Sequence, residues 1–257
     1  MNVTLRSYDC FLSKSQEIAG ETQVIKCGFK TNPAFISFIN KTIMATAQQI
    51  RNGYIDYVLT HDGQPKSVYS FVKKLKISEA DFYSFFASFD SIEKIIWVEL
   101  TVETLSAIRG QEVWTEYSSR DKMLSFFYSY TELLKKDRSF IIYSLGRSPK
   151  RLSAPEVLSG VRPIFENFAD ELIAEGLENG EIADRKFLTK RYKDALWIQF
   201  GFILNFWVND ESTDFEKTDE AIEKGINVTF DLLQRSPLDN LLEYGKFLSR
   251  NKKSFTI

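Results

Sequence analysis

The chain has 257 residues, of which 44% are hydrophobic and 14% aromatic, so it can build one large or two modest packed domains. Its formal net charge of −2 excludes a global basic field of the kind that signals nucleic-acid binding. No run of 18 apolar residues occurs, so the sequence predicts no membrane span, and the absence of a secretory signal predicts a cytoplasmic protein.

The first 43 residues differ from the rest of the chain. They hold both cysteines, Cys10 and Cys27, and show no sustained helical period, so residues 1–43 are expected to form an irregular extension with free thiols. One interpretation takes Met44 as the natural start and the extension as non-native. The other takes the extension as a genuine arm that tracks DNA or covers a pocket.

The next segment predicts three closely spaced helices and the start of a fourth. A first helix is expected over Ala47–Thr60, with His61 and the two residues after it as its stop. Within residues 64–92 an apolar face recurs at i, i+3, i+4 and i+7, formed by Val68, Phe71, Val72 and Leu75. Ser78 precedes two acids and is typical of an N-cap, and Ser88 opens a longer helix over about 92–108 in the same way. This is the outline of a helix-turn-helix.

These residues resemble the N-terminal DNA-binding domain of the TetR family of bacterial transcriptional regulators. The positions that fall on the family pattern without a gap are Ser67-Val68, Phe71-Val72, Leu75, Ile77-Ser78, Phe82-Tyr83, Phe86, Ser88 and Ile92. The resemblance implies an all-α fold, with a three-helix helix-turn-helix domain over 44–92 and a larger ligand-binding and dimerisation bundle over 93–257. It also implies contact with double-stranded DNA through Ser67, Lys73, Lys74, Lys76, Ser78, Glu79, Asp81, Tyr83 and Ser84.

Three departures from the family pattern occur. Lys76 stands where the family usually has glycine, so a left-handed backbone position must be relaxed or carry some strain. Glu79 and Asp81 stand where the recognition helix usually starts with basic or small polar residues, and Phe89 replaces a lysine, so the expected DNA face loses positive charge. Six basic residues face seven acidic ones between residues 44 and 100, so binding requires the positive charge to be segregated. The two acids either accept from cytosine N4 in the major groove or only favour the positive end of their helix.

Helical patterns continue to the C-terminus. Helices are expected at about 119–136, 138–146, 154–178, 184–208, 214–235 and 238–249. Pro163 is expected either to kink the third of these or to mark its true beginning. Helix 184–208 carries apolar side chains on nearly all of its faces, and helix 214–235 carries a broad apolar stripe that includes Gly225. We therefore expect a homodimer through these two helices, as the resemblance also implies, although the same stripes could fill only the subunit's own core.

Aromatic side chains dominate the helices that surround a central cavity in the resembled family. The predicted pocket consists of Phe126, Phe127, Tyr130, Phe140, Tyr143, Phe165, Phe168, Trp197 and Phe200. Such a pocket would take a small hydrophobic or amphipathic ligand, whereas the alternative interpretation is a plain aromatic core.

Enzymatic chemistry finds no support in the sequence. His61 is the only histidine, neither cysteine lies near the motif, and no metal-binding or phosphate-binding pattern occurs, so we expect no catalysis, metal or cofactor. Two functions stay open at this point. One is a dimeric, ligand-responsive DNA-binding repressor; the other is a TetR-fold lipid or small-molecule binder that has lost DNA binding, similar to the ubiquinone-biosynthesis relative of this fold.

Overall fold

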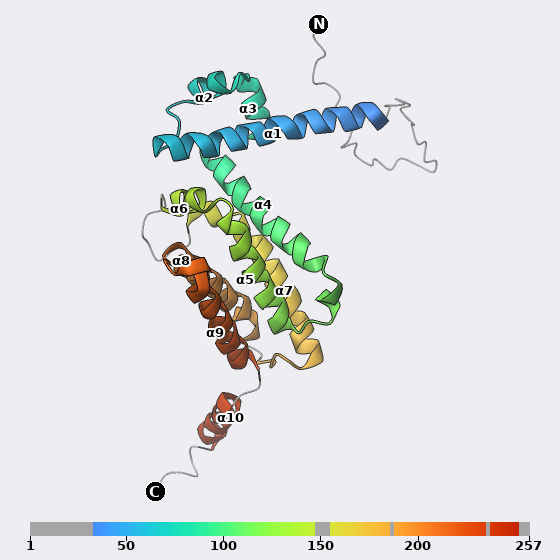
Figure 1. Cartoon of the computed structure of the whole chain (residues 1–257). Helices are drawn as coiled ribbons and strands as arrows, with labels where there is room; N and C mark the ends of the chain where they lie inside the picture. The colour runs from blue at the N-terminus through green and yellow to red at the C-terminus, as the bar shows by residue number, and fades with distance from the viewer. Residues whose placement is uncertain (1–32, 147–154, 186–187, 235–236, 252–257) are drawn as a thin grey trace, which may run out of the picture. The chain divides into compact units, whose positions relative to one another are not determined.

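A computed structural model describes residues 33–146, 155–185, 188–234 and 237–251 (Figure 1). Every regular element among these residues is helical, so the chain has the all-α fold that the sequence predicts. The chain divides into two compact units, 1–43 and 44–257. The two cysteines lie outside the described residues.

Four helices make up the N-terminal part of the described chain: α1 (Pro33–His61), α2 (Val68–Leu75), α3 (Glu79–Phe85) and α4 (Phe89–Arg109). Ser67, Ser78 and Ser88 each cap the helix that follows by accepting a hydrogen bond from the third backbone N–H. The predicted caps at Ser78 and Ser88 are thereby confirmed.

The close approach of α1 and α2 depends on Gly53. A β-carbon there would lie 2.6 Å from a methyl group of Leu75, and Gln49 Nε2 donates to the Leu75 carbonyl at 3.2 Å. Asp62, with φ of 50°, adopts the left-handed conformation that ends α1, so the stop predicted at this point is set by Asp62 rather than by the glycine beside it.

The remaining described chain is a helical bundle. Its elements are the 3₁₀ turns η2 (Glu112–Thr115), η3 (Glu156–Leu158), η4 (Thr189–Arg191) and η5 (Thr213–Phe215), and the helices α5 (Ser119–Lys135), α6 (Arg138–Gly146), α7 (Val161–Asn179), α8 (Tyr192–Val208), α9 (Glu216–Leu233) and α10 (Pro237–Arg250). The helix α5 packs against α4, α7 and α9, and α8 packs against α7 and α9 (Figure 1). None of the described helices combines the length and apolar character that crossing a membrane requires.

The structure corrects or decides three sequence-based expectations about the helices. The helix α1 begins at Pro33, so residues 33–43 are helical rather than irregular, and the division between the two units falls within this helix. Pro163 is the third residue of α7, where its missing N–H leaves no hydrogen bond unmade, so it marks the beginning of the helix and not a kink.

The third correction concerns helix 184–208, which begins only at Tyr192. The Arg185 guanidinium donates to the carbonyls of Leu232 and Gln234 at the end of α9, and the Ala183 N–H donates to the Leu233 carbonyl at 2.8 Å. These long-range hydrogen bonds hold residues 183–185 against the C-terminus of α9. The 3₁₀ turn η4 then leads into α8.

Candidate DNA-binding surface and aromatic core

The predicted helix-turn-helix consists of α2, α3 and the turn between them, and phenylalanines meet between the two helices. Phe71, Phe82 and Phe86 are buried, and the rings of Phe71 and Phe82 meet edge-to-face with centroids 6.3 Å apart. Tyr54 and Tyr57 of α1 lie edge-on against Phe71, with centroids 6.4 and 6.2 Å away. The two short helices therefore have fixed positions against α1.

The turn between the two helices places Lys76 in the left-handed region, with φ of 57° and ψ of 37°. The Ile77 N–H donates to the Val72 carbonyl at 3.1 Å, which is the six-residue bond of a Schellman stop. A glycine would accept this conformation without the steric conflict of a β-carbon. Lys76 thus occupies the strained position that the family pattern predicts.

All nine residues predicted to bind DNA are exposed. Four of them already make local hydrogen bonds: Ser67 caps α2, Ser78 and Asp81 form a reciprocal capping box, and Ser84 donates to the Asp81 carbonyl at 2.7 Å. The lysines, Glu79 and Tyr83 extend outward instead. The side chain of Tyr83 is 56% exposed.

Asp81 is part of the cap of α3. Its Oδ2 accepts from the Ser78 N–H at 3.0 Å and from the Ser78 hydroxyl at 2.7 Å, and these hydrogen bonds lower the pKa of Asp81 below its usual value. Asp81 and Glu79 are both exposed.

Positive charge gathers in and beside α2. We call Lys66, Lys73, Lys74 and Lys76 the basic group; all four are exposed, and no described residue forms an ion pair with any of them. The Nζ of Lys73 lies 5.9 Å from the ring of Tyr69, and that of Lys74 lies 4.8 Å from the ring of Tyr57. The segregation of charge that DNA binding requires is therefore present.

Tyr69 is a surface residue that the sequence analysis did not single out. Its ring is 60% exposed on the same helix as the basic group. The sequence could have indicated this exposure, because position 69 falls outside the apolar spacing set by Val68, Phe71 and Val72.

A buried polar network joins α1 to α4 and α6. The Tyr54 hydroxyl donates to Glu93 Oε1 at 2.5 Å, the Ser144 hydroxyl donates to Glu93 Oε2 at 3.1 Å, and Trp97 Nε1 donates to Ser144 at 3.0 Å. Gln64 Nε2 donates to the Tyr54 hydroxyl at 3.0 Å. Burial, followed by the bond to the Glu93 carboxylate, raises the pKa of Tyr54. Sequence reasoning counted Glu93 only as a surface acid.

The structure separates the nine predicted pocket residues into two groups. One group is a continuous aromatic cluster, formed by Phe126, Phe127, Tyr130, Phe165, Phe168, Trp197 and Phe200. Within it, the centroids of Phe165 and Phe200 are 5.0 Å apart, as are those of Trp197 and Phe200. Rings at these distances fill the space between α5, α7 and α8.

Phe140 and Tyr143, both on α6, lie elsewhere. The ring of Phe140 meets Tyr54 of α1 edge-on at 6.5 Å, and Tyr143 lines a small surface hollow together with Asp62, Gly63 and Gln64. Both residues therefore belong to the contact region of α6 with α1 and the loop after it, and not to the aromatic cluster.

Tyr130 is the main polar group within the cluster. It is buried, its hydroxyl accepts from Thr101 Oγ1 at 3.4 Å, and burial raises its pKa. Because this distance is long for a hydrogen bond between two hydroxyl groups, the Tyr130 hydroxyl has only a weak hydrogen-bond partner.

Residues 122–248, just under half of the chain, match the family model described as "Tetracyclin repressor-like, C-terminal domain". A solved structure described as a protein with unknown function from Rhodococcus sp. RHA1 is similar, with a TM-score of 0.49 and 12% identity over 74% of this chain and 96% of that chain. The comparison with curated proteins gives no match. The part of the chain from residue 122 to residue 248 is therefore similar to the C-terminal domain of TetR-like proteins.

Proposed function

We propose that this chain is a TetR-like transcriptional repressor that binds double-stranded DNA as a homodimer and responds to a small hydrophobic or amphipathic ligand. The observation that carries the proposal is the basic group, which is exposed in and beside a capped α2 and has no acidic partner among the described residues. Duplex DNA is held largely by phosphate neutralisation and counterion release, so a local cluster of free lysines matters more than the net charge of the domain.

The contacts on DNA follow from the side chains that remain available. Lys73 and Lys76 are exposed and would contact phosphates, and the hydroxyl of the exposed Tyr83 would donate to a phosphate oxygen. Glu79, at the first position of α3, can accept from cytosine N4 in the major groove. Ser67, Ser78, Asp81 and Ser84 would then hold the helix ends in place beside these contacts.

The first experiment is fluorescence anisotropy of the full chain with its own promoter region and with random duplex, over a series of salt concentrations. We expect tighter binding to the promoter than to random duplex. In a plot of log K against log salt concentration, the steepness of the slope should decrease by roughly 0.9 for each phosphate contact removed. Lys73→Ala should therefore decrease the steepness by about 0.9, and Tyr83→Phe should weaken binding without changing the slope.

Lys217→Ala is the matched control, because Lys217 is an exposed lysine on α9, away from the helix-turn-helix. The proposal fails if Lys73→Ala and Lys217→Ala have the same slope. It also fails if the chain binds neither duplex at low salt.

The homodimer is supported by apolar side chains that α8 and α9 leave in solvent. Ile198 and Phe202 of α8 are 71% and 53% exposed, and Val228 and Leu232 of α9 are 59% and 52% exposed. The two helices pack side by side, so these side chains offer a two-helix surface that a second copy can cover.

The oligomeric state tests this surface directly. Phe202→Glu should convert a dimer into a monomer in sedimentation velocity, because a buried interface does not tolerate an unpaired carboxylate. Val113→Glu is the control, since Val113 is an exposed valine in η2. A wild-type monomer, or a Phe202→Glu variant that stays dimeric, would remove the dimer from the proposal.

Ligand binding in the aromatic cluster requires the rings to move apart, because they now contact each other. Such a ligand would select a minor conformation of the bundle and shift its population. Native mass spectrometry of the purified chain tests for a retained hydrophobic molecule, and a bare protein mass in all preparations would count against this site.

The second candidate is a lipid or small-molecule carrier without DNA binding. The outward Glu79 favours it, because an acid at the start of the recognition helix repels phosphate. A retained lipid together with absent DNA binding would establish this function in place of the repressor.

A further inference from the structure

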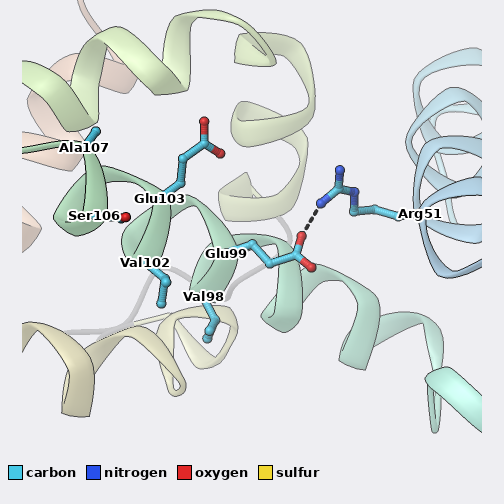
Figure 2. A pocket seen from close by; sticks show the side chains of 7 residues that line it. All are labelled: Arg51, Val98, Glu99, Val102, Glu103, Ser106 and Ala107. Carbon is cyan, nitrogen blue, oxygen red and sulfur yellow. Dashed lines mark hydrogen bonds and ion pairs between the residues drawn. The ribbon is translucent and has the colours of Figure 1, made fainter. Parts of the chain in front are cut away.

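Two adjoining cavities lie along α4, and they share the side chains of Arg51, Glu99 and Glu103. The first, of about 660 Å³, is lined mainly by α4 (Figure 2). The second, of about 520 Å³, lies between α1, α4 and the junction of α5 with α6. We call this second cavity the α1–α4 cavity; its volume is that of a site for a small organic molecule.

An ion pair separates the two cavities. Figure 2 shows Arg51 reaching from α1 to the carboxylate of Glu99 on α4. The side chains of Arg51 and Glu99 are 29% and 49% exposed, so the pair is accessible to water and to solutes. A solute cation can therefore compete with Arg51 for this carboxylate.

The charge of the α1–α4 cavity is negative. Four of its lining residues are acids, Asp56, Glu99, Glu103 and Asp137, against the two bases Arg51 and Lys136. Of the acids, only Glu99 has an ion-pair partner among the described residues. The cavity thus offers three carboxylates without a cation.

One part of the cavity wall is apolar, and the rest is polar or charged. The apolar residues are Ile55 and Leu59 of α1, Ile96 and Leu100 of α4, and Leu133 of α5. An open cavity with an apolar patch and an excess of carboxylates favours a molecule that has both an apolar part and a positive charge, because such a molecule buries the patch and also pairs with a carboxylate.

We infer that the α1–α4 cavity binds an amphipathic organic cation, which competes with Arg51 for the carboxylate of Glu99 and also pairs with the carboxylate of Glu103. This site is separate from the aromatic cluster, because it uses the outer side of α4 and none of the nine predicted pocket residues. Displacement of Arg51 would release a direct tie between α1 and α4. If the chain binds DNA as proposed above, this release would change the position of the helix-turn-helix and hence the DNA affinity.

The test is isothermal titration calorimetry of the full chain with two probes of the same shape and opposite charge, tetraphenylphosphonium and tetraphenylborate. We expect the cation to bind and the anion not to bind. Glu103→Gln should weaken binding of the cation by about two- to fivefold, the range for an exposed charge pair. Arg51→Gln should strengthen it severalfold, because the competing guanidinium is gone.

The matched control is Glu116→Gln, which removes the same charge at an exposed position that does not line the cavity. Equal binding of both probes, or equal effects of Glu103→Gln and Glu116→Gln, would overturn the site. Weaker cation binding in Arg51→Gln would also overturn it, since a merely structural role for Arg51 predicts that loss.

DNA binding is measured separately, so the two proposals fail independently. The phosphonium should change the DNA affinity of the wild-type chain and not that of Glu103→Gln. Calorimetric binding without an effect on DNA affinity would leave the site intact and overturn its coupling to the helix-turn-helix.

Discussion

Replacing Lys76 with glycine should make the protein more stable, although the substitution removes a whole side chain. Lys76 adopts φ of 57° and ψ of 37°, and this conformation costs an L-residue about 1–2 kcal/mol. Glycine has no β-carbon and escapes that cost, but it loses about 0.5–1 kcal/mol through the greater freedom of the unfolded chain. The net expectation is a gain of about 0.5–1 kcal/mol in the free energy of unfolding.

The assay is equilibrium denaturation in urea, with all proteins at the same concentration so that any dimerisation contributes equally. Lys73→Gly is the control, because Lys73 is also exposed but lies in the last turn of α2. Glycine there should lower the stability by roughly 0.5–1 kcal/mol through its poor helix propensity.

Both variants lose one positive charge from the basic group, so charge alone would move them in the same direction. The reasoning predicts opposite directions. It would be refuted if Lys76→Gly were no more stable than the wild-type chain while Lys73→Gly behaved as expected.

Three further predictions concern buried groups. Tyr54→Phe should cost about 1–3 kcal/mol of unfolding free energy, because the buried Glu93 loses a donor at 2.5 Å; a loss of only a few tenths in urea denaturation would contradict this. Phe200→Ala should cost about 3–5 kcal/mol if the aromatic cluster is solid core, whereas a cost below about 1 kcal/mol would show that ligand space already exists around it. Burial opposes ionisation of Asp210, but hydrogen bonds from Ser212 and Thr218 outweigh it and lower its pKa to about 2. Its stabilising effect, about 1–2 kcal/mol as a helix cap, should therefore be complete above pH about 4 and disappear as the pH falls toward 2, measured as the stability gap to Asp210→Ala over that range.

The helix-turn-helix outline could be read from the sequence because its determinants are local. The Ser78 cap bonds to Asp81 three residues away, and the stop at Lys76 bonds within α2. The apolar spacing of α2 likewise needs only neighbouring residues, and Phe71 and Val72 are buried as it predicts. Lys76 was also recognisable as a strained position before its backbone angles were known.

The outward direction of the basic group followed from the same spacing, whereas the fate of Asp81 did not. The sequence left open whether Asp81 contacts a base or serves its helix, because both require an acid at that position. The capping box shows that Asp81 serves its helix, since both its hydrogen bonds with Ser78 are made. A base contact by Asp81 and DNA binding by the remaining residues stay predictions.

Other features depended on residues far apart in the chain. The burial of Glu93 requires Tyr54 and Ser144, which are 39 and 51 residues away, and Arg185 donates to the carbonyl of Gln234, 49 residues away, beyond the end of α9. Periodicity could place Phe140 on an apolar face but could not say which neighbour that face meets, and it meets α1. Local hydrogen bonds and spacing are written in consecutive residues, so the sequence by itself determined the helices and their caps. Burial, ion pairing and cavities arise only when distant helices meet, so the tertiary structure decided the Glu93 network, the filled aromatic cluster and the acidic α1–α4 cavity.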